Sequence, residues 1–502
     1  RYSTMRWPSM VNVVVTGRLM MDSLLFGPAR FQRSEFFYRP FPGLTVRAAE
    51  YRTFGAPGGV VPWLLPTQRP SAYSHLQMRG RHSCLPSFCL FFRIPDSFGS
   101  SDATRNAGLW YIDGRVSSNW SAGMIVVIAP DSFKECATAA EVAGAMAAGW
   151  LCADPQAELR IVPLADGGEG TVAALAASRG RIQETVVTGP MGEPVTARWA
   201  LLDDGTAVIE MAEAAGLHLV APQLRNPLTA TTRGVGELIR AGLDAGARRF
   251  IVGVGGSATN DGGAGMAQAL GASLRDAADR ELAPGGAALA NLAEIDVSGM
   301  DARLAECTVF VACDVDNPLC GPEGASHVYG PQKGATPPQS AALDAALMRY
   351  AAGLRAGLGV DLRETPGAGA AGGLAAGLMA FLGARLKPGL ELVAEQAGLA
   401  AALEGADLVI TGEGSMDGQS LRGKVPLGVA RMAQERGVPC IALAGRLGSG
   451  HEAVYELGMT AVFALAPGPV SPEESMKNAL DWLCDRTESV ARVWLAASGK
   501  QL

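Results

Sequence analysis

The chain has 502 residues, a formal net charge of −7 and 48% hydrophobic residues, which is enough for two or three domains with cores of their own. The acidic balance argues against nucleic acid as a partner, and no run of about 18 apolar residues predicts a membrane span. The nine cysteines form no C-x-x-C pair and have no His cluster near them, so we interpret them as buried thiols in a reducing cytoplasm.

The first 123 residues differ from the rest in composition. They hold 14 Arg, no Lys, 6 acidic residues and 19 of the 31 aromatic residues, without a sustained helical or alternating period. Met124 stands directly before an apolar strand. We therefore expect residues 1–123 to be a disordered extension with no counterpart in related proteins, upstream of a native start at Met124. A basic organelle-targeting segment, Arg-rich and poor in acids, is the alternative.

From Met124 onward the chain alternates between strand, polar loop and helix. The apolar run 125–129 predicts a strand covered on both faces, and the polar loop 130–135 follows it. Thr138-x-x-Glu141 predicts a capping box at the start of a helix. A second strand at 159–163 leads into the polar loop 165–171 and another helix.

The region after about residue 185 breaks this alternation. Gly-Pro and Asp-Gly turns join its first short strands, which predicts hairpins. Later strands are separated by helices, as around 234–244 and 264–270. The strands expected in this region lie at 186–188, 195–202, 207–211, 249–254 and 309–313.

The first pattern returns at residue 407, with buried-type strands at 408–411, 440–443 and 462–465. Together with the two early strands they predict one five-stranded parallel sheet. We expect a flavodoxin-like doubly wound domain made of residues 124–185 and 390–502, interrupted by an inserted mixed α/β domain of residues 186–389. In such sheets, ligands gather beyond the carboxyl ends of the strands.

The glycine-rich stretch Gly253–Gly265 lies between a strand and a helix. Its glycines allow close approach of the backbone to a ligand, and the helix start favours an anion. Asp261 is an acid in a loop that otherwise favours anions, which makes it a candidate to accept the proton of a substrate hydroxyl. Two other interpretations stay open: a turn that needs glycine for backbone reasons alone, and a dinucleotide site, because Gly253-x-Gly255-x-x-Ala258 nearly matches that fingerprint.

In a second glycine-rich stretch, Gly412–Lys424, the spacing Gly418-x-x-x-x-Gly423-Lys424 matches most of a P-loop. Val425 stands where the P-loop has its metal-binding Ser or Thr, so we do not predict a P-loop nucleotide site. Glu413 and Asp417 are instead candidates to hold Mg²⁺ together with water and phosphate oxygens. A solvated acidic turn is the alternative.

Carboxylates recur close to the ends of the apolar strands. Each of them alone could be a helix cap. Together, with no Cys/His metal set and no Ser-His pair, they favour Mg²⁺-dependent phosphoryl transfer over hydrolysis. These acids are Asp131, Asp166, Glu169, Asp261, Asp314, Asp316, Glu413 and Asp417, and the lysines in similar loops are Lys134, Lys333 and Lys424.

Seven ordered stretches between residue 124 and about residue 495 resemble the type I glycerate kinase family. They are 128–135, 165–171, 187–194, 253–265, 312–321, 330–335 and 412–419. The resemblance implies ATP-dependent phosphorylation of D-glycerate, with 2-phosphoglycerate favoured over 3-phosphoglycerate as the product. It also implies a two-domain α/β build, a nucleotide and glycerate as partners rather than nucleic acid or a membrane, and it allows a homodimer. An NAD-dependent hydroxy-acid dehydrogenase and a non-catalytic anion-binding protein of the same fold are the alternatives.

These patterns assign roles to individual residues, with ATP and Mg²⁺ as the expected cofactors. Asp261 or Asp166 would accept the proton of the attacking hydroxyl, and Lys134 would neutralise phosphate charge. The metal candidates are Asp131, Glu413 and Asp417. The residues expected to bind substrate or phosphate are Ser132, Gly167, Gly168, Glu169, Gly170, Thr171, Ser257, Thr259, Asn260, Gly262, Gly263, Asp314, Asn317, Lys333 and Lys424.

Overall fold

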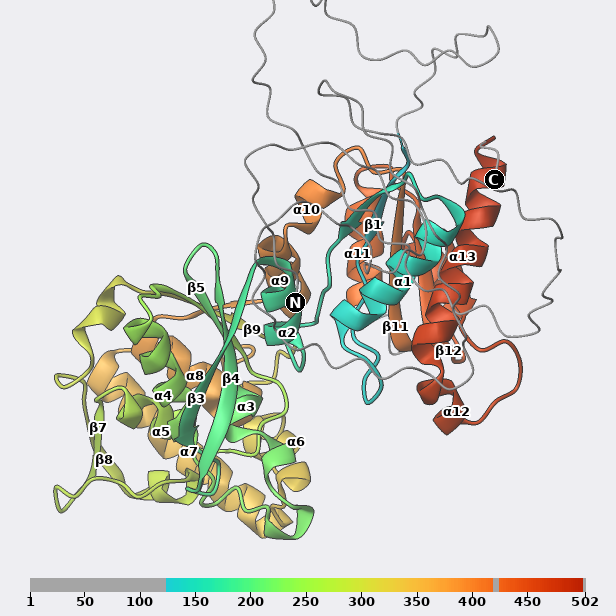
Figure 1. Ribbon diagram of the computed structural model, residues 1–502. Helices are drawn as coiled ribbons and strands as arrows, with labels where there is room; N and C mark the ends of the chain where they lie inside the picture. The colour runs from blue at the N-terminus through green and yellow to red at the C-terminus, as the bar shows by residue number, and fades with distance from the viewer. Residues whose placement is uncertain (1–122, 419–423, 500–502) are drawn as a thin grey trace, which may run out of the picture. The chain divides into compact units, whose positions relative to one another are not determined.

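The computed structural model describes residues 123–418 and 424–499, which form helices and strands throughout (Figure 1). The disordered extension predicted for residues 1–123 therefore lies, but for its last residue, outside the described part of the chain. Two main sheets organise the described residues, one of five strands and one of six, together with a two-stranded ribbon. No helix among the described residues is both long and apolar enough to cross a membrane.

The five-stranded sheet has the order β13-β12-β11-β1-β2, and all its pairings are parallel. Counted along the chain, this is the strand order 2-1-3-4-5 of the flavodoxin-like fold. The predicted fold class is therefore confirmed. Its strands are β1 (Ile125–Ile128), β2 (Glu158–Ile161), β11 (Leu408–Met416), β12 (Cys440–Leu447) and β13 (Ala461–Ala464).

Alternate residues of this sheet face two separate cores, as expected for strands covered on both sides. Val126 and Ile128 pack with α1 and α13, whereas Val127 and Ala129 pack with α2, α9 and α11. Trp150 is fully buried in the first of these cores. The helices are α1 (Ala139–Ala153), α2 (Thr171–Arg179), α9 (Gly389–Ala397), α10 (Leu399–Ala402), α11 (Val425–Gln434), α12 (Pro472–Lys477) and α13 (Ala479–Ala497), with the 3₁₀ segment η6 (His451–Leu457).

The capping box predicted at Thr138 is present at the start of α1. The backbone N–H and the hydroxyl of Thr138 donate to Oε2 of Glu141 at 2.9 and 2.8 Å, and the Glu141 N–H donates back to the Thr138 hydroxyl. These bonds satisfy donors that an uncapped helix end would leave unpaired. They fix where α1 begins after the polar loop that ends β1.

The six-stranded sheet has the order β10-β9-β6-β5-β4-β3. β3, β4 and β5 pair antiparallel, as the predicted hairpins require, and β5, β6, β9 and β10 pair parallel. Its strands are β3 (Gly180–Thr188), β4 (Pro194–Leu202), β5 (Thr206–Glu210), β6 (Arg249–Gly253), β9 (Thr308–Ala312) and β10 (Arg385–Lys387). β3 crosses the predicted domain boundary after residue 185, and the division of the chain into domains stays a prediction.

Helices and short segments surround this second sheet, and the ribbon of β7 (Ser273–Asp276) and β8 (Leu292–Asp296) was not expected from the sequence. The helices are α3 (Met211–Ala215), α4 (Arg233–Asp244), α5 (Ala264–Ala269), α6 (Ala325–Tyr329), α7 (Pro337–Leu358) and α8 (Ala370–Leu382). The 3₁₀ segments are η1 (Leu217–Leu219), η2 (Pro222–Leu224), η3 (Gly286–Asn291), η4 (Ala302–Glu306) and η5 (Pro331–Lys333).

β11 is longer than its apolar run predicts. The sequence places the end of this strand at Thr411 and a polar loop after it, but the strand continues to Met416. The additional residues pair with β12, for example Glu413 with Ala444. Hydrogen bonding to the neighbouring strand thus extends β11 beyond its hydrophobic residues, and Glu413 lies on a strand rather than in a loop.

Candidate active site

The carboxyl ends of three neighbouring strands bring acidic side chains to one edge of the five-stranded sheet. Asp131 follows β1, Asp166 follows β2, and Glu413 lies in the last part of β11. β1 pairs with β2 on one side and with β11 on the other, so the order of the strands along the chain changes direction here. In open α/β sheets, ligands bind at this position.

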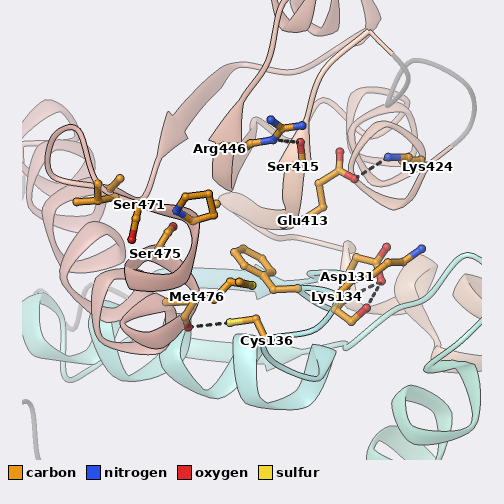
Figure 2. Close-up of a pocket in the computed structure, with 18 of the residues that line it drawn as sticks. Asp131, Lys134, Cys136, Glu413, Ser415, Lys424, Arg446, Ser471, Ser475 and Met476 are labelled. Atoms are coloured by element: carbon orange, nitrogen blue, oxygen red, sulfur yellow. Dashed lines mark hydrogen bonds and ion pairs between the residues drawn. The ribbon is translucent and has the colours of Figure 1, made fainter.

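A cavity of about 550 Å³, here called the first cavity, opens at this edge (Figure 2). One part of its wall is charged and contains the three acids with Lys134, Lys424 and Arg446. Another part is apolar and comes from Phe133 and the segment from Ala466 to Ala479. Figure 2 shows Ser471, Ser475 and Met476 on the side away from Lys424 and Lys134. The cavity therefore suits a ligand with an apolar ring at one end and anionic groups at the other.

Burial and like charge act together on Asp131, which is 7% exposed. The pKa of this carboxyl is raised from 3.8 to about 7, first by burial and then by the nearby Asp166 and Glu413, against a hydrogen bond from Ser132 and the charge of Lys134. The Ser132 N–H donates to Oδ1 of Asp131 at 2.6 Å. A carboxylate in such surroundings is stabilised by any cation that enters.

These acids fit a magnesium ion that is shared with phosphate groups better than one held by the protein alone. Within residues 123–418 and 424–499, no three His, Cys, Asp or Glu side chains come together as a metal site. Asp131 and Glu413 line the same cavity, and Mg²⁺ commonly takes one or two carboxylates together with water and substrate phosphates. Asp417 does not line this cavity, and its Oδ2 lies 4.0 Å from Nη2 of Arg446. The predicted metal set is thus brought together only for Asp131 and Glu413.

A second, smaller cavity of about 240 Å³ lies next to the loop that follows β2. Its wall includes Asp314 and Tyr329, and burial raises the pKa of Asp314, although a hydrogen bond from the Gly389 N–H lowers it. Asp166 is the residue that the first and second cavities share. The second cavity is lined by Asp166, Gly167, Gly168, Val254, Gly255, Gly256, Ser257, Ala312, Cys313, Asp314, Val315, Tyr329, Gln332, Ala370 and Ala371.

The stretch Gly253–Gly265 divides into two parts with different surroundings. Its first part, up to Ser257, lines the second cavity. Asp261, in the other part, is fully buried and accepts hydrogen bonds from the N–H and hydroxyl of Thr232 at 2.8 and 2.9 Å and from the N–H groups of Gly263 and Gly265. Burial raises the pKa of Asp261 despite these bonds. Because its oxygens are occupied inside the fold, the structure does not support Asp261 as the proton acceptor.

Other residues expected to bind phosphate in this stretch also turn into the protein. The Gly262 N–H donates to the Gly372 carbonyl at 3.0 Å, and the Gly263 N–H donates to Asp261. Thr259 and Asn260 are fully buried. These amides and side chains are therefore not available to a ligand in either cavity. α5 begins only at Ala264, so no helix opens on the glycines as a dinucleotide fingerprint would require.

Several predicted binding residues outside this stretch are likewise held by neighbouring groups. Lys333 is 1% exposed, and its Nζ donates to the Thr259 carbonyl at 2.7 Å. Asn317 accepts a hydrogen bond from the Tyr329 hydroxyl and donates to the Glu323 carbonyl. The Thr171 hydroxyl donates to the Gly168 carbonyl.

The remaining predicted residues lie at the cavities or beside them. Ser132, Lys134 and Lys424 line the first cavity, and Nζ of Lys424 forms an ion pair of 3.6 Å with Glu413. Gly167, Gly168, Ser257 and Asp314 line the second. Glu169 and Gly170 line neither; they border a separate hollow on the other side of the loop after β1.

Some residues at these cavities have no signal in the sequence. Phe133 and Met476 sit 343 positions apart and meet in one wall only because the chain folds. Glu210, a buried acid that lines neither cavity, does have a signal, since it stands at the end of β5. Its Oε1 accepts the Val172 N–H at 2.7 Å at the start of α2, and burial raises its pKa to about 7. The sequence predicts a strand through Met211, whereas β5 ends at Glu210 and α3 begins at Met211.

The doubly wound sheet and the charged cavity at its switch point define an α/β protein with a candidate small-molecule site. A model of the glycerate kinase family matches residues 126–495. A glycerate kinase of Bacillus subtilis is 52% identical over 362 residues, 72% of this chain and 95% of that protein. A glycerate 2-kinase of Escherichia coli is 49% identical over 370 residues, 73% of this chain and 97% of that protein.

A solved structure agrees with these relatives. The crystal structure of a protein assigned as glycerate kinase 2 from Salmonella typhimurium LT2 covers 75% of this chain and 100% of that chain, with a TM-score of 0.70 and 49% sequence identity. The chain belongs to the glycerate kinase family, a family of phosphotransferases. The resemblance inferred from the seven sequence stretches is therefore confirmed.

Proposed function

We propose that the protein transfers the γ-phosphoryl group of ATP to a hydroxyl of D-glycerate and releases ADP and phosphoglycerate. The observation that supports this most directly is the position of Asp166, which lines both the first and the second cavity. A group at that position can contact the acceptor in one cavity and the phosphoryl group in the other. The first cavity, with its charged and apolar walls, is the proposed nucleotide site, and the second is the proposed glycerate site.

In this proposal, Asp166 accepts the proton of the attacking glycerate hydroxyl. Its Oδ1 accepts the Gly168 N–H at 3.0 Å, which orients the carboxylate within the loop after β2. As the hydroxyl oxygen bonds to the γ-phosphorus, the bond from that phosphorus to the bridging oxygen breaks and ADP leaves. Lys134 and Lys424 line the same cavity and stabilise the negative charge on the phosphate oxygens.

Asp131 and Glu413 are the residues proposed to hold Mg²⁺ when the nucleotide binds. The ion supplies charge neutralisation for the phosphate oxygens. In its absence, Asp131 is a buried carboxylate beside two other acids, which fits a group that gains stability from a cation. We propose 2-phosphoglycerate as the product, which agrees with the name of the Escherichia coli relative. A cytoplasmic location, a homodimer and the division into a flavodoxin-like and an inserted domain stay predictions.

The full chain incubated with ATP, Mg²⁺ and D-glycerate tests this function by ³¹P NMR. A phosphoglycerate resonance together with ADP is expected, and the chemical shift and coupling identify the 2- or the 3-phosphate. Asp166→Asn should lower kcat by about 10² to 10⁴-fold, the usual contribution of a general base. Asp203→Asn, in an exposed turn, is the matched control.

Three outcomes would contradict the proposal in different ways. Glycerate binding without ADP formation would indicate an anion-binding protein of the same fold. Full activity in Asp166→Asn would remove this residue from the mechanism. Binding and reduction of a nicotinamide cofactor would restore the dehydrogenase alternative, which no observation in the described residues favours.

A further inference from the structure

Two segments far apart in the sequence line the second cavity. One is the loop after β6, which contributes Val254, Gly255, Gly256 and Ser257. The other runs from α6 into η5 and contributes Tyr329, at the end of α6, and Gln332, in η5. The size and shape of the proposed glycerate site therefore depend on how these segments are held relative to each other.

Two buried hydrogen bonds connect the same two segments. Nζ of Lys333, the residue after Gln332, donates to the carbonyl of Thr259, two residues after Ser257, at 2.7 Å. Nδ2 of Asn260 donates to Oγ of Ser326, in α6, at 2.9 Å. Lys333 is 1% exposed, and Asn260, Ser326 and Thr259 are fully buried. Each segment thus carries one donor and one acceptor, and the two bonds form a double connection behind the cavity wall.

Burying an ammonium group in this place is costly, because the charged form loses its water. Burial lowers the pKa of Lys333 to about 7, while the negative charge of Asp261 opposes this shift. A methionine or leucine would fill the same space without that cost. We therefore infer that the role of Lys333 depends on its hydrogen bond to the Thr259 carbonyl.

We propose that Lys333 and Ser326 are positioning residues for the acceptor. Through their hydrogen bonds to Thr259 and Asn260, they hold the Val254–Ser257 loop at a fixed distance from Tyr329 and Gln332. This distance sets the affinity of the second cavity for glycerate. Neither side chain lines either cavity, so both act through the backbone and side chains they hold. The inference rests on the proposed function for the identity of the acceptor.

Steady-state kinetics of the full-length Lys333→Met variant test this role. Met keeps the length of the side chain but cannot donate to Thr259. The KM for D-glycerate should rise at least 10-fold, while the KM for ATP, bound in the first cavity, changes by less than twofold. Hydrogen exchange should become faster at residues 254–257 and at residues 329–332, and the rest of the protein should keep its wild-type exchange rates.

Ser326→Ala is the second variant, because it removes the partner of Asn260 with a smaller change of volume and remains informative if Lys333→Met does not fold. It should raise the KM for glycerate in the same selective way. Ser340→Ala is the matched control. Ser340 is also a buried serine, and its Oγ lies near Gly330 beside η5. This Oγ has no hydrogen-bond partner within the described residues. This control should keep wild-type kinetics and exchange.

The outcomes separate this inference from the function on which it rests. If the wild-type chain turns over glycerate and both variants fold with an unchanged KM for glycerate, the positioning role is wrong. If the KM values for ATP and glycerate rise together, the residues contribute only general stability and the inference is again wrong. Absence of turnover in the wild-type chain refutes the proposed function itself, and the acceptor site with it.

Discussion

Asp131→Asn should make the protein more stable at neutral and alkaline pH, because it removes a buried charge that has acidic neighbours. The folded-state pKa of Asp131 is raised from 3.8 to about 7 by burial and by Asp166 and Glu413. Between these two pH values the folded state binds more protons than the unfolded state. The free energy of unfolding of the wild-type chain therefore falls as the pH rises through this window and levels off above pH 7.

The size of the effect follows from the pKa shift. A rise of about 3 units at 1.36 kcal/mol per unit gives a ceiling of about 4 kcal/mol above pH 7. At pH 5, proton linkage gives a loss of about 1.7 kcal/mol in the free energy of unfolding of the wild-type chain. A further loss of about 2.6 kcal/mol should therefore occur between pH 5 and pH 8. Asn is neutral throughout and can still accept the Ser132 N–H that Asp131 accepts.

Urea unfolding of the wild-type chain, Asp131→Asn and Asp485→Asn at pH 5 and pH 8, without divalent cations, measures this difference. Asp485 lies exposed on α13 and serves as the control, with no pH-dependent gain expected. The advantage of Asp131→Asn over the wild-type chain should grow by about 2 to 3 kcal/mol from pH 5 to pH 8. An advantage that is equal at both pH values would refute the argument that the Asp131 carboxylate is strained by burial and by its acidic neighbours.

Three further predictions concern the two cavities and the buried loop. Asp261→Asn should lower the free energy of unfolding by about 2 to 4 kcal/mol, because Asn cannot accept hydrogen bonds from all the donors around it. It should leave kcat of the folded protein within about 10-fold of wild type, and lost turnover at full stability would contradict this. Gly262→Ala should lower the free energy of unfolding, measured in urea, more than Gly246→Ala does. Both glycines have positive φ, but only at Gly262 would a Cβ meet Tyr350, at 2.5 Å, so equal losses would show that the loop relaxes. Met476→Glu places a carboxylate in the apolar wall of the first cavity and should raise the KM for ATP about 10-fold or more, without changing the KM for glycerate. An unchanged KM for ATP would argue against the first cavity as the nucleotide site.

The order of the elements was largely predictable because it depends on local patterns. Apolar runs identified the five strands of the parallel sheet, and the capping box at Thr138 marked the start of α1. The alternation of Val126 and Val127 between two cores is what a strand covered on both faces requires. The ordered motifs also identified the family, since each is a short stretch whose meaning does not depend on distant residues.

The roles of the acids could not be separated in this way. Asp166 and Asp261 have the same signal in the sequence, an acid among glycines near the end of a strand. Packing gives the two acids different surroundings, because Thr232 and the amides of α5 surround Asp261, whereas Asp166 lies at the wall of two cavities. The same holds for lysines, since Lys134 reaches a cavity and Lys333 is buried.

The sequence by itself determined the fold class and the family. Those features follow from the periodicity of hydrophobic residues, from turn residues and from short motifs. Each of these signals depends only on residues that are close together in the sequence. The tertiary structure alone decided where β11 ends, which acids meet at the switch point, and that Phe133 and Met476 share a wall. These depend on contacts between residues tens to hundreds of positions apart, and the energy of such contacts comes from burial and pairing that exist only once the chain has folded.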